Sequence, residues 1–161
     1  MEINFLALFV AALSTLVVGS VWYGPLFGKV WMKENGFSEE ELKQGSMVKI
    51  FGLTFVFSLF LALMMHFLCI HQFGPLGMIG GPDFIETAKP SYAAFMTDYG
   101  DAYRTYQHGA LHGFMSGLFL ALPLVGINGL FERKSWKYIF VHSGYWTVVM
   151  TIMGAIVCGW V

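Results

Sequence analysis

The sequence predicts an all-α membrane protein: four transmembrane helices in an antiparallel bundle, with interfacial amphipathic helices in the first two loops. Charged residues make up only 12% of the 161 residues, against about 25% in typical soluble domains. The chain also contains four long apolar stretches, each near the roughly 20 residues that a helix needs to cross a bilayer. They lie at residues 3–22, 50–70, 109–131 and 138–160. Together they form a single membrane domain over 1–161.

The first apolar stretch is expected to be a retained transmembrane helix. It is longer than the apolar region of a signal peptide, and no small-x-small cleavage motif follows it. Small residues recur at every fourth position, which favours close packing against another helix. They are Ala7, Ala11, Thr15 and Gly19. The aromatic residues that follow suit the headgroup level, and Gly24-Pro25 is predicted to end the helix.

The first loop, residues 23–49, is expected to lie at the membrane surface. Residues 30–35 form a predicted short interfacial helix, and Gly36 ends it. The pattern from Ser38 to Glu41 is that of a capping box, in which the Ser38 hydroxyl accepts the backbone N–H of Glu41 and the Glu41 carboxylate accepts the backbone N–H of Ser38. Both features indicate a structured connector.

The second loop, residues 71–107, is too polar and too rich in glycine and proline to cross the membrane. After Pro90, aromatic residues recur three or four positions apart, which predicts an amphipathic helix on the membrane surface. These residues are Tyr92, Phe95, Tyr99, Tyr103 and Tyr106. A continuous helix would align Asp101 with His108 and His112; a break at Gly100 is the alternative.

The third span carries a row of glycines at Gly109, Gly113 and Gly117. Residues four apart share one helix face, so this row lets another helix approach closely. The row suggests a homo-oligomer held through it, within the lipid bilayer. Pro123 is expected to kink the span. Residues 132–137 then form a short turn, which makes the last two spans an antiparallel pair.

The distribution of Lys and Arg predicts an N-out, C-out orientation. Loops 23–49 and 132–137, with their margins, hold seven of the nine basic residues, whereas loop 71–107 holds Lys89 and Arg104. Cytoplasmic loops carry the excess of positive charge. Loops one and three are therefore expected in the cytoplasm, and loop 71–107 outside it.

Four histidines are then expected at the outer membrane face, at the ends of the second and third spans. They are His66, His71, His108 and His112. We expect His66 to face His112, and Asp101 to add an oxygen donor. Imidazole ligands suit Zn, Cu, Ni or Fe. The leading hypothesis is an outer site for a metal ion or a small solute, and a bis-histidine haem site for electron transfer is an alternative.

A structural or accessory subunit, whose histidines only pack, is the main rival hypothesis. The chain has no nucleophile elbow, phosphate loop or dinucleotide motif, so a non-enzymatic role is expected. A net charge of -1 offers no basic face for nucleic acid. Cys69 and Cys158, at the outer ends of their spans, leave open both a disulfide and two free thiols. A further polar group at the cytoplasmic end is expected to anchor the turn; it comprises Asn128, Glu132, Arg133 and His142.

Three motifs and the order of the spans carry a family resemblance. The motifs are Trp22-Tyr23-Gly24-Pro25-Leu26-Phe27-Gly28-Lys29 with Trp31-Met32, then Asn128-Gly129-Leu130-Phe131-Glu132-Arg133, and Gly144-Tyr145-Trp146. They resemble the bacterial family known as domain of unknown function 1761. The resemblance covers nearly the whole chain and implies a four-helix bacterial inner-membrane protein. It implies no activity and supplies no functional residues.

Overall fold

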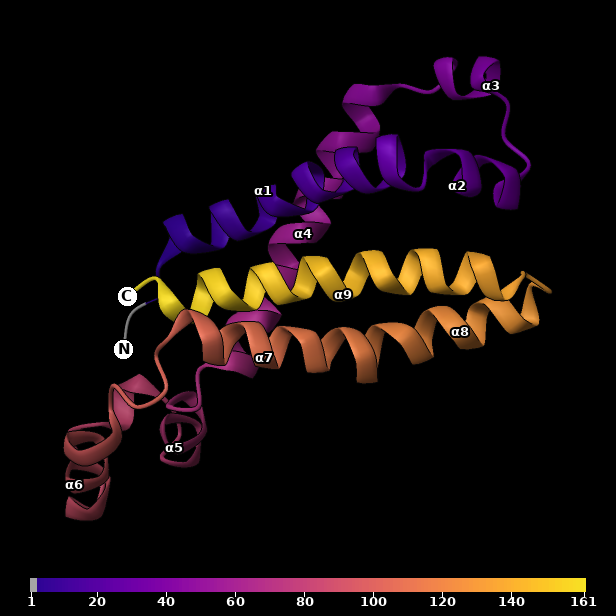
Figure 1. Cartoon of the computed structure of the whole chain (residues 1–161). Coiled ribbons are helices and arrows are strands. Elements are labelled where there is room, and N and C mark those ends of the chain that lie inside the picture. The colour runs from indigo at the N-terminus through magenta and orange to yellow at the C-terminus, as the bar shows by residue number, and fades with distance from the viewer. Residues whose placement is uncertain (1–2) are drawn as a thin grey trace.

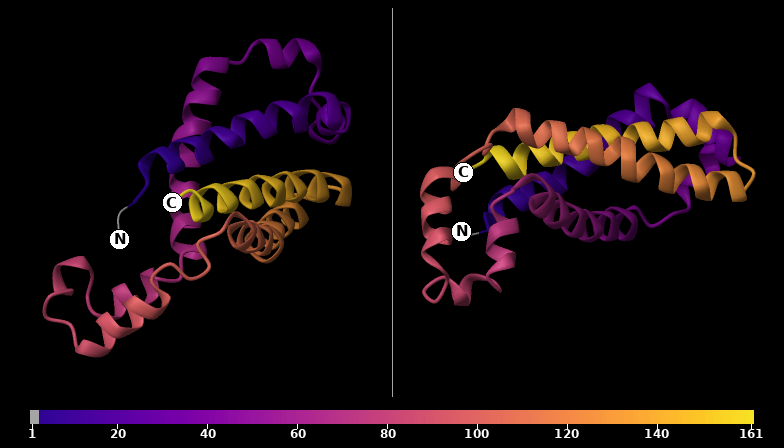
Figure 2. Two further views of the ribbon diagram at one scale, coloured as in Figure 1. Left: turned by 60° about the vertical axis from the view of Figure 1, so that its left-hand side comes forward. Right: turned by 90° about the horizontal axis from the view of Figure 1, so that it is seen from below.

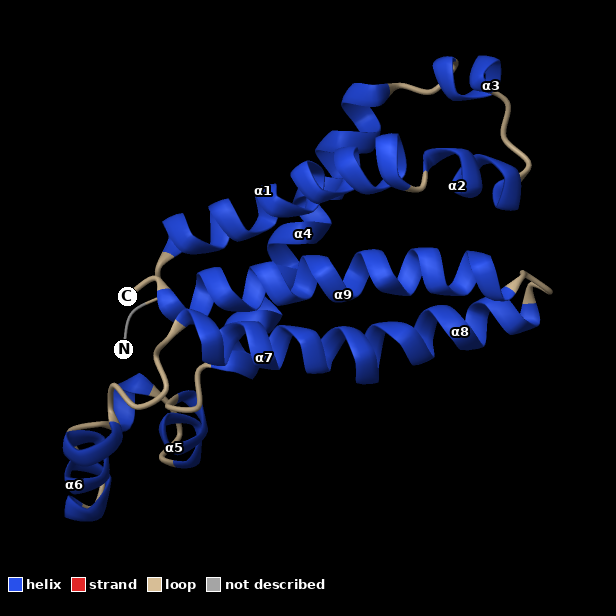
Figure 3. Ribbon diagram, in the orientation of Figure 1, coloured by secondary structure: helices blue, strands red, loops and turns tan. Residues whose placement is uncertain are grey.

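The computed structural model describes residues 3–161, and within this range the fold is all-helical (Figure 3). Four helices are long and apolar enough to cross a membrane. They are Phe5–Leu26, Met47–Cys69, Tyr106–Phe131 and Trp136–Gly159. The predicted all-helical class with four potential membrane spans is therefore confirmed, and the span boundaries differ from the predicted ones by a few residues.

The spans are joined by shorter helices (Figure 1). In chain order the elements are α1 (Phe5–Val21), η1 (Trp22–Leu26), α2 (Gly28–Asn35), α3 (Glu39–Lys43), α4 (Met47–Cys69), α5 (Phe73–Met78), η2 (Pro82–Phe84), α6 (Pro90–Tyr99), α7 (Tyr106–Ser116), η3 (Gly117–Ala121), α8 (Leu122–Phe131) and α9 (Trp136–Gly159).

Helix α9 contacts all three other spans. The chain reverses after α8, so that α9 runs back beside α8 and α7, and the two ends of the chain lie at one end of the molecule (Figures 1 and 2). Two hydrogen bonds join the first span to α9. Tyr145 donates its hydroxyl to the Thr15 carbonyl of α1 at 3.0 Å, and Trp22 of η1 donates its indole N–H to the Val141 carbonyl at 3.0 Å. The last span is therefore the centre of the fold.

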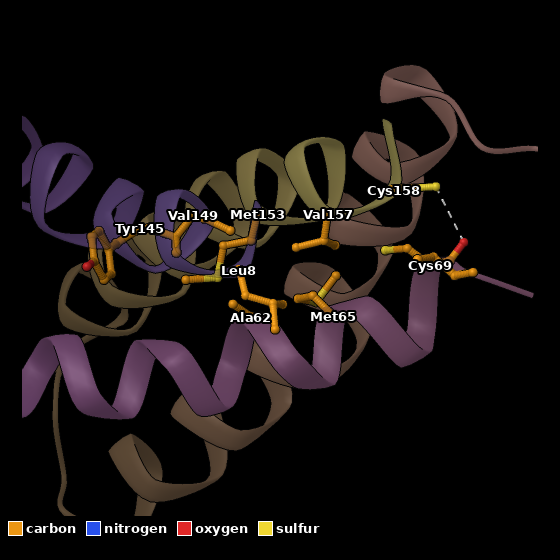
Figure 4. Close-up of a cluster of buried hydrophobic side chains, with 11 residues drawn as sticks. Leu8, Ala62, Met65, Cys69, Tyr145, Val149, Met153, Val157 and Cys158 are labelled. Carbon is orange, nitrogen blue, oxygen red and sulfur yellow. Dashed lines mark hydrogen bonds between the residues drawn. The ribbon is translucent and has the colours of Figure 1, made fainter. Parts of the chain in front are cut away.

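A small apolar core fills the space between α1, α4 and α9 (Figure 4). Ala11 and Ala62 are fully buried, and their small side chains let the helix backbones approach Val149 and Met153. Large apolar side chains on the outer faces are exposed, among them Phe119 at 65%. An apolar outer surface of this kind is what a bilayer requires of a helix.

The glycine row of α7 and η3 packs against α9 of the same chain. A Cβ at Gly109 would overlap the Gly154 carbonyl oxygen, one at Gly113 the Met150 carbonyl oxygen, and one at Gly117 the backbone of Thr147. Only glycine permits this approach of the two helices. The row is occupied within the chain, so the predicted homo-oligomer would need another face and stays a prediction.

Both prolines within the spans lie at π-helical turns. Pro25 lies inside η1, and Pro123 lies in the first turn of α8, directly after η3. A proline removes one helical hydrogen bond and crowds the preceding turn, and the wider π turn absorbs this change. The prediction that Gly24-Pro25 ends the first helix agrees with the structure: α1 ends at Val21, and Gly24, at φ -100° and ψ -105°, kinks the π turn that follows.

The first loop follows its prediction closely. Gly36, at φ 71°, ends α2, and the capping box of Ser38 and Glu41 begins α3. The backbone N–H and the hydroxyl of Ser38 both donate to the Glu41 carboxylate at 2.8 Å. These two hydrogen bonds favour the charged form and lower the pKa of Glu41.

In the second loop, the aromatic helix breaks at Gly100, as the alternative interpretation had it. A Cβ at Gly100 would overlap the Met96 carbonyl oxygen. Tyr103 then adopts the left-handed conformation, at φ 61°. Only the first three aromatic residues of the predicted stripe therefore share helix α6, and Tyr103 belongs to the connection that leads into α7.

Candidate metal centre

Three imidazoles meet where α4 ends and α7 begins. One ring nitrogen from each of His71, His108 and His112 lies within 4.8 Å of the others. The Nε2 atoms of His71 and His108 are 2.9 Å apart, and the three ring centroids are separated by 4.5–4.9 Å. His71 is exposed, whereas His108 and His112 are half-buried. The group is open on one side.

His71 is positioned by its neighbour Gln72. The α4 helix ends at Cys69, with Ile70 as its extended cap, so His71 stands directly beyond the helix. The Gln72 side chain is buried, and its amide donates to the carbonyls of Tyr99 and Ala102 at 2.9 and 2.8 Å. These two bonds fix the end of α4 to the end of α6, and they hold His71 between them.

His108 and His112 project from consecutive turns of α7, because they are four residues apart. The hydroxyl of Thr105 caps this helix by accepting the amide N–H of His108 at 3.2 Å. The ring of Tyr103 stacks on the His108 ring, with centroids 5.0 Å apart. The short connection before α7 thus supplies both the cap of the helix, through Thr105, and one wall of the group, through the Tyr103 ring.

The connection that carries Tyr103 is attached to the last turn of α9. Cys158 donates its thiol to the Tyr103 carbonyl at 3.4 Å, and Arg104 donates Nε–H to the Cys158 carbonyl at 3.2 Å. Cys69 and Cys158 are both buried and free, so the structure has free thiols where a disulfide was the alternative. Their role here is to pack α4, α7 and α9 together.

Two predicted ligands lie outside the group. His66 is buried in the last turn of α4, where its ring packs against Phe73 at 5.0 Å, and its Nε2 has no hydrogen-bond partner among the described residues. Asp101 is exposed on the turn after α6. The helix break at Gly100 removes its expected alignment with the histidines of α7. The partner of His112 is therefore His71 rather than His66.

A second group, at the opposite end of the bundle, was only partly expected. The hydroxyl of Tyr23 lies 2.9 Å from Nδ1 of His142, and the rings of Tyr138 and Tyr145 contact this pair. The group joins Tyr23 of the first motif to Tyr145 of the last. The sequence therefore contained both aromatic motifs, but nothing in it indicated that they meet. The Nε2 atom of His142 is buried and has no partner among residues 3–161.

The fold and the histidine group together define a class: a small polytopic membrane protein with three imidazole nitrogens, donors that suit a transition metal, grouped at one end. The profile of the family described as "protein of unknown function (DUF1761)" matches residues 6–158. The chain belongs to this family. No curated protein and no solved structure matches it.

Proposed function

We propose that His71, His108 and His112 bind one transition-metal ion, and that the protein serves as a membrane metal-binding protein without enzymatic activity. The observation that carries this proposal is the convergence of three imidazoles, two from α7 and one from just beyond the end of α4. Zn, Cu, Ni and Fe are the metals that imidazole ligands suit. No carboxylate joins the three rings among the described residues, so the proposed donor set is all nitrogen.

The spacing of the rings fits one ion after a small movement. Two nitrogens bound to a tetrahedral zinc ion at its usual distance lie about 3.3 Å apart. The Nε2 atoms of His71 and His108 are 2.9 Å apart. For this pair an outward shift of roughly 0.4 Å is therefore enough, and the exposed ring of His71 is free to make it. The ring nitrogen of His112 lies within 4.8 Å of the other two.

A haem group fits the same residues less well. A porphyrin must lie between two opposed axial imidazoles. Here the ring of His112 lies 4.5 and 4.9 Å from the two rings that would have to face each other. The geometry supports a bare ion in preference to haem.

The rival candidate is a structural subunit, and one observation favours it. The direct hydrogen bond between His71 and His108 satisfies one nitrogen of each ring without any ligand. In that case the histidines join α4 to α7 and bind nothing. Loss of a histidine would then change stability alone.

Elemental mass spectrometry on protein purified without a polyhistidine tag or chelator separates the two candidates. We expect near-stoichiometric metal in the wild type, and loss of that metal in His71→Ala and His112→Ala. His142→Ala, at the other end of α9, should keep the metal and serves as the matched control. Absence of metal in the wild type after incubation with all four ions would overturn the proposal.

We further propose that the site faces the outside of a bacterial inner membrane, with the chain N-out and C-out. The support is the excess of Lys and Arg in loops 23–49 and 132–137. The two ends of the chain lie at the same end of the molecule as the start of α7, which carries His108 and His112 (Figure 1). In this orientation the metal would exchange with the extracytoplasmic compartment.

A further inference from the structure

An apolar groove runs along the membrane-facing side of the protein, below the three histidines. Its volume is about 380 Å³. Helix α4 forms one wall, and α7 with η3 and α8 forms the other. The floor is α9, through Trp146 and Met150. The wall side chains include Leu61, Met64 and Leu68 on α4, and Ser116, Leu120 and Leu124 on the facing span.

The groove and the histidine group share one face of α7 and meet at the end of α4. Ser116, Leu120 and Leu124 all line the groove at four-residue intervals. The same interval continues outward from Ser116 to His112 and then to His108. On the opposite wall, α4 ends at Cys69, one residue after Leu68, and His71 stands just beyond that end. The imidazoles therefore lie at the surface end of the groove.

The polarity of this combined site changes along its length. The hydroxyl of Ser116 donates to the His112 carbonyl at 2.8 Å, so it offers the groove no free donor. Below it the walls are apolar, and Met64, Leu120 and Leu124 are more than half exposed, so the groove opens toward the acyl chains of the bilayer. A ligand that fits must have a polar head group and an apolar chain.

The depth of the groove indicates which amphiphile fits. Eight residues separate Ser116 from Leu124, which corresponds to about 12 Å along a helix. This is less than half of the roughly 30 Å apolar core of a bilayer. A neighbouring hollow continues deeper along α4 to Thr54, but α7 and α8 supply no wall to it. A site one leaflet deep suits a lipid chain, whereas a transmembrane helix of a second copy would need the full thickness.

We propose that the groove and the histidine group together bind one anionic membrane lipid. The acyl chain lies in the groove, and the carboxylate or phosphate of the head group lies at the three imidazoles. This inference rests on the proposed function, because a metal ion held by three histidines keeps one position open for a further ligand. An anionic oxygen of the head group would take that position. The lipid head group would then close the metal site.

Electron paramagnetic resonance of a spin-labelled lipid tests the proposal. The probe is stearic acid with a nitroxide on its chain, added to the full-length protein in discs of neutral phosphatidylcholine. Leu120→Trp fills the groove. Leu130→Trp is the matched control, because it makes the same change at a similarly exposed position outside the groove (51% and 56% exposed).

We expect a motionally restricted probe signal in the wild type and in Leu130→Trp. In Leu120→Trp this signal should fall to the level that spin-labelled phosphatidylcholine gives. Zinc should increase the restricted signal in the wild type and leave it unchanged in His112→Ala. Metal content, measured on the same samples, should be unaffected by Leu120→Trp.

Three results would overturn the inference. The first is an equal restricted signal in Leu120→Trp and Leu130→Trp, with metal still bound, which leaves the metal proposal intact. The second is a restricted signal that neither zinc nor His112→Ala changes, which places the head group elsewhere. The third is a dimer that Leu120→Trp alone converts to a monomer, which assigns the groove to a second copy. If the wild type binds no metal but Leu120→Trp and His112→Ala both lower the probe signal, the metal proposal fails and the lipid site stands.

Discussion

At the scale of single residues, His66 shows how strongly the end of a helix controls which side chains meet. Its ring is 3% exposed and packs against Phe67 and Phe73. His71, only five residues later, stands beyond the helix and contacts α7. The helix ends between these two histidines, so only the second can turn toward the group.

Replacing His66 with leucine tests its separation from the site. Leucine has a similar volume and removes a buried nitrogen that lacks a partner among the described residues. Relief of an unpaired polar group of this kind is worth about 1 kcal/mol or more. We therefore expect His66→Leu to keep the metal and to raise the free energy of unfolding by about 1 kcal/mol. Metal content and thermal unfolding in detergent check this, and a destabilised or metal-free variant would contradict it.

At the scale of elements, Gln72 connects two of them, because its side chain stands just beyond α4 and bonds the end of α6. Gln72→Leu would leave two carbonyls without their donors, at a cost of about 1–3 kcal/mol in local stability. We expect faster amide hydrogen exchange over residues 90–105 and weaker metal binding. Gln107→Leu changes an exposed glutamine of the same region and should alter neither. Equal exchange in the two variants would show that Gln72 does not hold α6.

The close contact of α7 with α9 predicts a large effect at Gly113. An alanine there would overlap the Met150 carbonyl oxygen, so the two backbones must separate. We expect Gly113→Ala to lower the free energy of unfolding by about 2–3 kcal/mol, the upper part of the range for overpacked cores. Gly52→Ala, in a helix position where a Cβ meets nothing within 4 Å, should stabilise by up to about 1 kcal/mol. Thermal unfolding of both variants tests this prediction. An unchanged free energy of unfolding in Gly113→Ala would contradict this helix packing.

The elements that the sequence predicts well are those set by local properties. Span length, the capping box at Ser38 and the stop at Gly36 depend on neighbouring residues alone, and all are present. The π turn at Pro25 escaped prediction, because a proline with a preceding glycine indicates where a helix ends but not the form of its last turn. The partner of His112 escaped it as well. That partner depends on where α4 ends and on the bonds of Gln72, which involve residues about thirty positions away.

At the scale of the whole molecule, the proposed orientation can be tested with single cysteines. In a background without Cys69 and Cys158, Glu86→Cys lies in loop 71–107 and Glu40→Cys in loop 23–49; both positions are exposed. An excess of basic residues in loops one and three favours the cytoplasmic side for them. We expect a membrane-impermeant maleimide to label Glu86→Cys in intact spheroplasts and Glu40→Cys only after lysis. The reverse pattern would place the histidines on the cytoplasmic side.

The central position of α9 has a consequence for biogenesis. The spans that it joins precede it in the sequence, so during translation they are inserted into the bilayer before their common partner has been made. Until then the glycine face of α7 has no helix to contact, and the thiol that anchors the Tyr103 carbonyl does not yet exist. The histidine group therefore cannot mature helix by helix. It is completed in one late step, when the last span enters the membrane.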